Sequence, residues 1–179
     1  MRKLSHDEIA KERFKLENLK KMPRCPIYGL LDSVRSLYNV GSMFRTSDGA
    51  RISKLILTGY TPHPPRKEIE KTALGATQTV PWDYVKEPAV ALRELRAAGV
   101  RVCVLEHTEA SVPYYTLTRS VFPLCLIVGN EITGVSRESL AEADMAIDIP
   151  MFGVKQSLNV AVAYGIVVFE LVRLFNQGR

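Results

Sequence analysis

Residues 124–134 have the sequence Leu-Cys-Leu-Ile-Val-Gly-Asn-Glu-Ile-Thr-Gly, in which an apolar run leads into a polar stretch bounded by two glycines. An apolar run without alternation is typical of a strand buried on both faces of a parallel sheet. Similar runs lie at 27–31, 54–59, 100–105 and 145–149, and helix-forming stretches lie at 40–50, 68–74, 87–98, 137–143 and 157–176. The sequence therefore predicts an α/β domain with a mainly parallel sheet and helices on both faces.

Polar residues follow several of these strands. In sheets of this class, ligands bind beyond the carboxyl ends of the strands. The residues in those places are Asn39, Arg45, Glu106, Asn130, Glu131, Ser157 and Asn159. Each has an ordinary structural alternative: Asn39 or Ser157 as a helix N-cap, Asn130 or Glu131 as a partner for the amides of the next helix, and Arg45 as a surface cation. Together, at the ends of several strands, they are better explained as one site.

Composition restricts the class of protein. The chain has 179 residues, 46% of them hydrophobic and 24% charged, which fits one folded domain with a real core. No apolar run is long enough to span a membrane, and the start turns polar too early for a signal peptide. The three cysteines form no Cys-x-x-Cys pair and the three histidines are scattered, which disfavours a disulfide framework or a metal site. A reducing cytoplasm is the expected location.

Positive charge is concentrated at the start of the chain. Residues 1–24 contain eight of the 24 Lys and Arg residues but four of the 19 acids, so they carry +4 of the net +5. Ser5 and Glu8 have the spacing of a capping box, which predicts a helix. We therefore divide the chain into a basic helical extension, 1–26, and a domain, 27–179. A basic arm favours a polyanionic partner such as RNA, although a solvated helix face is the alternative.

The common nucleotide and hydrolase motifs are absent. The sequence contains no Gly-x-Gly-x-x-Gly and no Gly-x-Ser-x-Gly. Gly129 and Gly134 have the glycine spacing of a phosphate-binding loop, but Val135 and Ser136 follow where Lys and Ser or Thr are needed. A dinucleotide-binding domain, a phosphate-binding loop and an α/β-hydrolase are therefore disfavoured.

Three stretches in order resemble the motifs of the SpoU (TrmH) class of the SPOUT RNA methyltransferase superfamily. They are Asn-Val-Gly-Ser-Met-Phe-Arg-Thr at 39–46, Leu-Ile-Val-Gly-Asn-Glu-Ile-Thr-Gly-Val at 126–135, and Ile-Pro-Met-Phe-Gly-Val-Lys-Gln-Ser-Leu-Asn-Val-Ala at 149–161. The resemblance covers about residues 27–176. It implies a C-terminal deep trefoil knot, a homodimer, S-adenosylmethionine as cofactor and a ribose 2′-hydroxyl of RNA as methyl acceptor.

The resemblance also assigns residues. In the family, cofactor contacts come largely from the backbone of the knot loops, which here map to Leu105, Glu106, Gly129, Ile149, Met151 and Leu158. The polar residues of the motifs, which we predict to be catalytic, map to Asn39, Arg45, Glu131, Ser157 and Asn159. Asn39 would orient Arg45 or the ribose. Glu131 would position the part of the site that contains Arg45, or the helix of the third motif. Ser157 and Asn159 would organise the site and the knot.

The reaction itself explains why an arginine is useful. A ribose hydroxyl is a poor nucleophile at neutral pH, so it needs a base or a group that stabilises its oxyanion. Arginine normally stays protonated and holds phosphate well, although the family arginine is proposed to become the base once RNA phosphate is bound. Arg45 is therefore the key catalytic candidate, in either role. The methyl donor already carries a sulfonium, so no metal is expected.

RNA selection is expected to come from segments outside the motifs and from the partner subunit. The candidates are Lys11, Arg13, Lys20 and Lys21 of the arm, Arg45, and Arg66 and Lys67 of the segment 61–81. That segment could equally be a solvated linker, and Trp82 and Tyr84 are expected to pack in the core rather than stack on bases. In the family, small apolar residues often follow the arginine and threonine of the first motif. Here Ser47 and Asp48 stand in those positions, which is a mild departure.

The compact body slightly favours transfer RNA over ribosomal RNA. The alternatives are an RNA-binding protein that kept the fold without turnover, and a methyltransferase for a small molecule.

Overall fold

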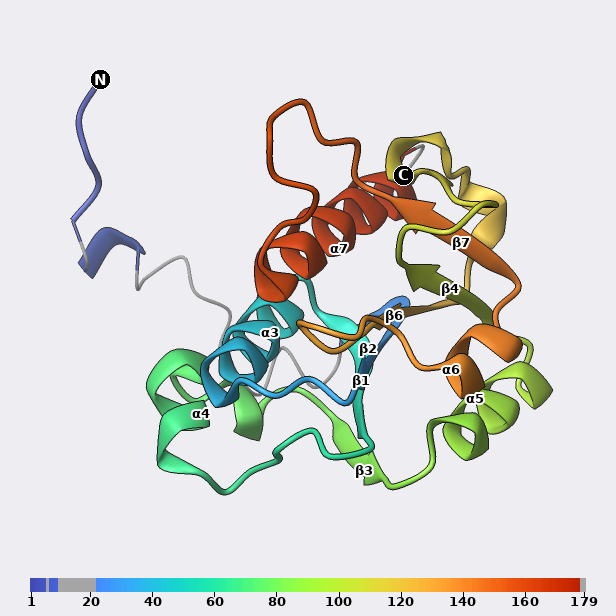
Figure 1. The fold of residues 1–179 in the computed structure, drawn as a ribbon. Helices are drawn as coiled ribbons and strands as arrows, with labels where there is room; N and C mark the ends of the chain where they lie inside the picture. Colours follow the sequence, from blue (N-terminus) through green and yellow to red (C-terminus); the bar gives the residue numbers. More distant parts are fainter. Residues whose placement is uncertain (6, 10–21, 178–179) are drawn as a thin grey trace.

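A parallel sheet forms the centre of the computed structural model, which describes residues 1–5, 7–9 and 22–177 (Figure 1). Within these residues, seven strands follow the order β3-β2-β1-β6-β4-β7-β5, and each neighbouring pair is parallel. The strands are β1 (Cys25–Asp32), β2 (Ile52–Thr58), β3 (Trp82–Val85), β4 (Arg101–Leu105), β5 (Val112–Pro113), β6 (Leu124–Val128) and β7 (Met145–Asp148). The predicted α/β class with a parallel sheet is confirmed.

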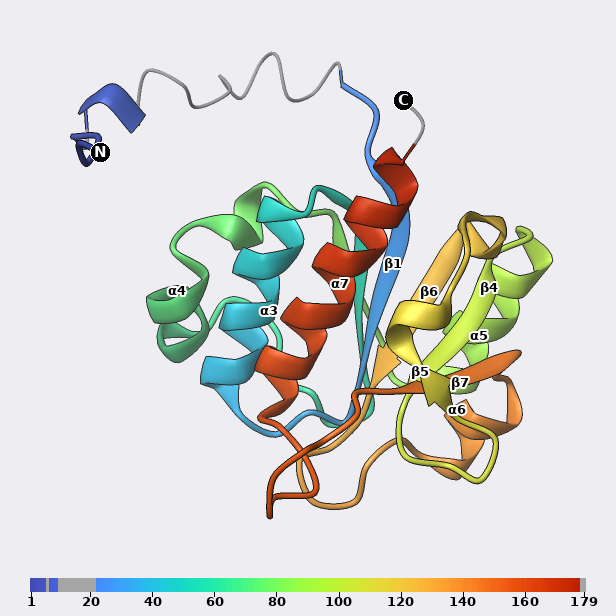
Figure 2. The same ribbon diagram turned by 90° about the horizontal axis from the view of Figure 1, so that it is seen from above.

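Helices cover both faces of this sheet (Figure 2). On one side lie α3 (Leu37–Gly49), α4 (Lys67–Ala73) and α7 (Val160–Asn176), and on the other lie α5 (Pro88–Ala97) and α6 (Arg137–Ala141). Single 3-10 turns occur at η1 (Ala76–Gln78), η2 (Tyr114–Thr116) and η3 (Arg119–Val121). Helix α7 packs against α3, β1 and β6, so the end of the chain returns to the middle of the sheet.

Alternate side chains of the central strands pack in two separate hydrophobic cores, one on each face of the sheet. Ile27 and Leu31 of β1 join the cluster under α3 and α7, whereas Leu30 joins the cluster under α5. All three side chains are fully buried. Burial on both faces is the physical reason why these strands lack alternation in sequence.

The packing of α7 on the sheet centres on Tyr164, which is fully buried. Its hydroxyl lies 2.8 Å from the Ser47 hydroxyl of α3. A Cβ built on Gly29 of β1 would lie 2.6 Å from that hydroxyl, so only glycine leaves room for the pair. Burial raises the pKa of the Tyr164 phenol. The hydrogen-bonded pair therefore stays neutral and fixes α7 against α3.

Most of the predicted helices and strands are present, but several begin or end at other residues than predicted. Helix α3 begins at Leu37 and its N-cap is Ser36, whose side chain accepts from the Asn39 amide, so Asn39 is not the cap. Helix α7 begins at Val160 with Asn159 as its N-cap, and Ser157 lies outside the helix. Strands β3 and β5 were not predicted. Strand β3 carries Trp82, which is half-buried, and Tyr84, which is 40% exposed. The prediction that both side chains pack in the core is therefore only partly right for Trp82 and wrong for Tyr84.

The N-terminal extension is described only in part. Ser5 and Glu8 form the capping box, since the Ser5 amide donates to the Glu8 carboxylate at 2.7 Å and the Glu8 amide donates to the Ser5 hydroxyl at 3.2 Å. Arg2 pairs with Glu8 at 2.7 Å. The candidates Lys11, Arg13, Lys20 and Lys21 fall outside the described residues. No helix among the described residues is long and apolar enough to cross a membrane.

Candidate active site

Three of the predicted polar residues meet through their side chains. The side-chain nitrogen of Asn39 donates to Glu131 Oε1 at 2.9 Å, and the side-chain nitrogen of Asn159 donates to Asn39 Oδ1 at 3.1 Å. They come from α3, from the loop after β6 and from the N-terminus of α7. Asn39 is thus held by both of its polar atoms. The three motifs, far apart in sequence, share one hydrogen-bonded cluster.

Glu131 also fixes the backbone that leads into α3. Its carboxylate accepts from the Arg35 amide at 2.9 Å and from the Ser36 amide at 3.0 Å, in addition to Asn39. Partial burial alone would raise the pKa of Glu131, but these hydrogen bonds outweigh it and hold the pKa below 4.5. Glu131 is therefore ionised at neutral pH and carries the negative charge of the cluster.

The turn that presents Glu131 is built by Asn130 and two glycines. Asn130 Oδ1 accepts from the amides of Ile132 and Thr133 at 2.8 and 2.9 Å, so it closes its own turn rather than serving the next helix. Backbone hydrogen bonds of 3.0 Å join Asn130 and Gly134 in both directions. A Cβ on Gly129 would lie 2.2 Å from backbone atoms of Gly134 and Val135, so glycine is needed there.

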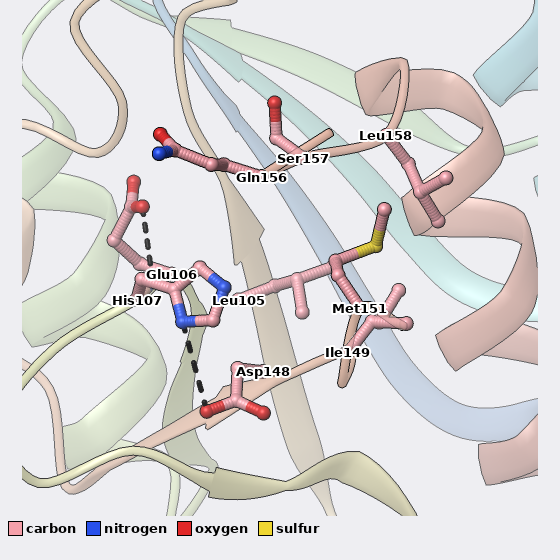
Figure 3. A pocket seen from close by; sticks show the side chains of 9 residues that line it. All are labelled: Leu105, Glu106, His107, Asp148, Ile149, Met151, Gln156, Ser157 and Leu158. Atoms are coloured by element: carbon pink, nitrogen blue, oxygen red, sulfur yellow. Dashed lines mark hydrogen bonds and ion pairs between the residues drawn. The ribbon is translucent and has the colours of Figure 1, made fainter. Parts of the chain in front are cut away.

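A pocket opens beside this cluster, at the ends of β4 and β7 (Figure 3). It is lined by Leu105, Glu106, His107, Asp148, Ile149, Met151, Gln156, Ser157 and Leu158. In Figure 3, Met151, Ile149 and Leu158 form an apolar side and Glu106 and Gln156 lie on the other. Five of the six predicted cofactor residues line it, Gly129 being the exception, and so does Ser157.

The sequence did not identify His107, Asp148 and Gln156 as pocket residues. His107 Nδ1 lies 3.8 Å from the Asp148 carboxylate, which also accepts from the Ser111 hydroxyl at 2.7 Å. His107 is the second residue after β4, Asp148 is the last residue of β7, and Gln156 lies inside the third motif. They could have been found by extending the strand-end rule by one residue on either side.

Glu106 connects the pocket to the turn after β6. Its carboxylate accepts from the Val135 amide and from the His107 amide, both at 3.0 Å. Gly134 adopts a φ of +71°, and a Cβ there would lie 2.3 Å from Glu106 Oε2. A side chain at Gly134 would therefore be strained by this φ and would displace the Glu106 carboxylate. Besides lining the pocket, Glu106 holds the loop that carries Glu131.

Arg45 is placed apart from the hydrogen-bonded cluster. It lies on α3, and its exposed side chain has no hydrogen bond or ion pair with the described residues. It shares the outer face of the helix with Ser42 and Tyr38, which are three and seven positions earlier. Of the other RNA candidates, Arg66 precedes α4 as its N-cap and Lys67 begins it, both exposed.

Within the described part of the chain, no three His, Cys, Asp or Glu side chains gather as a potential metal site. A second, more open hollow is lined by Arg35, Ser36, Asn39, Glu131 and Ile132. The cluster therefore lies between two concavities, because Asn39 and Glu131 line the open hollow and Asn159 directly follows Leu158 of the first pocket.

Known proteins with similar sequences include rRNA methyltransferases. The 23S rRNA (guanosine-2′-O-)-methyltransferase RlmB of Neisseria meningitidis is 30% identical over 168 residues, covering 93% of this chain and 66% of that protein. RlmB of Vibrio vulnificus is 35% identical over 150 residues, covering 83% and 59%. The chain thus spans about three fifths of the length of these curated relatives.

Solved structures with the same architecture include an Aquifex aeolicus TrmH/SpoU tRNA modifying enzyme, at TM-score 0.80 and 30% identity over 89% of this chain and 80% of that one. The AdoMet-bound rRNA methyltransferase of Sinorhizobium meliloti gives TM-score 0.78 and 35% identity over 87% and 59%. The parallel sheet and its helices are consistent with the knotted fold that the resemblance implies. The model of the SpoU rRNA methylase family matches residues 26–169, and this chain belongs to that family.

Proposed function

We propose that the protein transfers a methyl group from S-adenosylmethionine to a ribose 2′-hydroxyl of RNA. The observation that carries this proposal is the direct hydrogen bonding of Asn39, Glu131 and Asn159 beside the pocket at the ends of β4 and β7. A methyl transfer needs a donor and an acceptor held in line. A pocket and a more open hollow on either side of one polar cluster provide that arrangement.

The pocket suits the proposed cofactor. Leu105, Ile149, Met151 and Leu158 offer apolar surface for the flat and aliphatic parts of such a molecule. The Glu106 and Asp148 carboxylates offer negative charge to a cationic ligand. When bound, S-adenosylmethionine supplies the methyl group and its own positive charge.

The polar residues divide into one catalytic candidate and its supports. Arg45 is free to take an RNA phosphate and to stabilise or deprotonate the attacking hydroxyl. Asn39 faces the open hollow and orients the ribose. Glu131 and Asn159 act through Asn39, which both of them contact. Ser157 belongs with the pocket residues rather than with this cluster.

Ribosomal RNA is the substrate class that the curated relatives favour. RlmB proteins are named for 23S rRNA, whereas the Aquifex structural neighbour is named for tRNA modification. The slight preference for transfer RNA that the compact body suggested is not supported by the curated relatives. We propose that the arm, residues 1–26, adds non-specific affinity for RNA in the cytoplasm, while 27–179 form the catalytic domain.

We also propose that a second copy of the chain covers an apolar face of α7. Val162, Ile166 and Phe169 follow helical spacing on the outer face of this helix and are 51%, 37% and 51% exposed. Phe152 and Val154 of the preceding loop are 97% and 99% exposed. Apolar surface of this extent is typical of an interface. Sedimentation should show a dimer, and Phe169→Glu should give a monomer.

Labelled S-adenosylmethionine and total RNA from cells lacking this protein test the reaction. The wild type should label ribosomal RNA at a ribose 2′-oxygen. Arg45→Ala should abolish labelling while calorimetry shows unchanged cofactor binding. Arg101→Ala is the matched control, because Arg101 is also exposed but lies at the amino end of β4, opposite the strand ends that form the site. Cofactor binding with no labelling of any RNA would indicate an RNA-binding protein without turnover instead.

A further inference from the structure

Three aromatic rings lie together on the surface at the edge of the sheet formed by β3. The His63 ring stacks on Trp82 with centroids 6.2 Å apart and planes at 27°, and it lies 4.9 Å from the Tyr84 ring. Trp82 is half-buried. Its ring packs edge to face against the ring of Phe44, a core residue, with the two centroids 6.1 Å apart. His63 is exposed and Tyr84 is 40% exposed. The cluster is therefore anchored from below and open to solvent above.

A fourth aromatic residue connects this cluster to the candidate active site. Tyr60 is 62% exposed, yet its hydroxyl is fixed 2.9 Å from the Asn130 side-chain nitrogen. Asn130 is the residue directly before Glu131. The Tyr84 hydroxyl donates to the Gly59 carbonyl at 2.6 Å, next to Tyr60 in the chain. Two hydrogen bonds thus link Tyr84 of β3, by way of Gly59 and its neighbour Tyr60, to Asn130 of the loop that holds the polar cluster.

The backbone under Tyr60 is tied to the same part of the molecule. Thr61 is 2% exposed, and its hydroxyl donates to the Leu31 carbonyl and accepts from the Val34 amide, both at 3.0 Å. Val34 directly precedes Arg35, which lines the open hollow. Because these bonds are buried, the segment that carries Tyr60 has a defined position relative to the hollow. The aromatic surface is preorganised and not a solvated linker.

The charge around these rings is mainly positive. The exposed cations of the neighbouring segments include Arg35, Arg66, Lys67 and Lys86, against the exposed acids Glu68, Glu87 and Glu131. None of the four cations has an ion pair within the described residues. Asp83, the acidic residue of β3, forms an ion pair with Lys54. Cations interleaved with exposed aromatic rings are the pattern by which proteins bind unpaired nucleotides.

We propose that Tyr60, together with the His63–Tyr84 pair, stacks on the base of an unpaired RNA nucleotide that neighbours the methylated one. The inference rests on the proposed RNA methyltransferase function and adds the place where RNA is held outside the motifs. The ribose to be methylated lies in the hollow at Asn39, and the strand continues over Tyr60 toward β3. The modified position would therefore lie in an unpaired loop or end of the RNA, where a base is free to stack.

Four single variants separate stacking from structural support. Tyr60→Ala removes the ring and the hydroxyl, whereas Tyr60→Phe keeps the ring and loses only the bond to Asn130. His63→Ala removes the second ring. Tyr115→Ala is the control, since Tyr115 is 58% exposed on the far strand edge, at η2. Filter binding of end-labelled total RNA from cells lacking the protein measures affinity, and calorimetry measures S-adenosylmethionine binding.

Tyr60→Ala should weaken RNA binding about 5- to 100-fold, the range of one lost base stack. His63→Ala should weaken it about as much, Tyr60→Phe and Tyr115→Ala should stay within about twofold of the wild type, and cofactor binding should not change. Equal losses in Tyr60→Ala and Tyr60→Phe would overturn the proposal, because the hydroxyl would then matter and not the ring. So would an unchanged affinity in Tyr60→Ala. RNA bound but never methylated by the wild type would refute the proposed function alone.

Discussion

The side-chain amide of Asn159 donates a hydrogen bond of 3.1 Å to the side-chain oxygen of Asn39. The same residue caps α7, because Asn159 Oδ1 accepts from the amides of Ala161 and Val162 at 2.9 and 3.3 Å. One side chain therefore starts the last helix with its oxygen and holds the site with its nitrogen. These two tasks can be separated by substitution.

Asn159→Asp should keep the cap and lose the link. A carboxylate still accepts from the amides of α7, so the free energy of unfolding should stay near that of the wild type. It cannot donate to Asn39 and repels the oxygen there, so methyl transfer should fall about tenfold or more. Asn159→Ala should lose both, including about 1 kcal/mol of stability. Urea unfolding and initial rates measure the two effects, and full activity in Asn159→Asp would show that the link is unimportant.

Glu131→Gln should disturb the start of α3 without a large change of shape. The glutamine presents one nitrogen donor to a site where both oxygens now accept, from the amides of Arg35 and Ser36 and from Asn39. We expect a loss of about 1 kcal/mol in unfolding free energy and a clear loss of methyl transfer. Glu138→Gln, on the exposed side of α6, is the control. Equal activity of the two variants would contradict the positioning role.

The stabilisation from Glu131 should depend on pH. Its folded-state pKa lies below 4.5, so folding favours the ionised form. That contribution is complete above the unfolded-state pKa and disappears as the pH falls through the folded-state pKa. The difference in unfolding free energy between wild type and Glu131→Gln should be constant near neutral pH and shrink progressively below pH 4.5. Urea titrations of both proteins along this range measure it, and a pH-independent difference would refute the assignment.

Gly129→Ala should be strongly destabilising. Its Cβ would meet backbone atoms of Gly134 and Val135 at 2.2 Å, and backbone cannot move aside as a flexible side chain can. A loss of about 3 kcal/mol or more is expected. Gly153→Ala is the matched control from the third motif, where nothing lies within 4 Å of a new Cβ. Similar unfolding midpoints for the two variants would show that the turn after β6 is not so tightly closed.

Glu106→Ala should weaken cofactor binding through the turn as well as through the pocket. It removes the acceptor for the amides of Val135 and His107. We expect affinity for S-adenosylmethionine to fall about tenfold or more, because two amides lose their partner and the pocket wall loosens. Glu109→Gln, an exposed neighbour, should bind normally. Calorimetry on both variants provides the comparison.

The sequence predicted those parts of the fold whose physical cause is local. The apolar run of β6 and the helix-forming pattern before Asn176 locate a buried strand and α7 without any tertiary information. Strand β3, with the sequence Trp-Asp-Tyr-Val, alternates and lies at the edge of the sheet, so it lacks the continuous apolar character used for the others. Strand β5 has two residues, too few for any pattern.

The candidate site shows the same limit. The motifs supplied Asn39, Glu131 and Asn159, but which of them contact one another depends on the return of α7 to α3. The double role of Glu106 could not be predicted, because it depends on a turn 28 residues away approaching its carboxylate. The stacking of His63 on Trp82 and Tyr84 depends on β3, a strand that the sequence did not indicate.

The hydrogen bond between Asn39 and Asn159 has a consequence for the order of folding. It joins residues 120 positions apart, and the bond from Asn39 to Glu131 spans 92. Closing such long segments is entropically slow compared with forming a helix or a local turn. A chain whose sheet and α3 have formed still lacks the site until α7 docks. Recovery of methyl transfer should therefore lag behind recovery of secondary structure when the protein refolds.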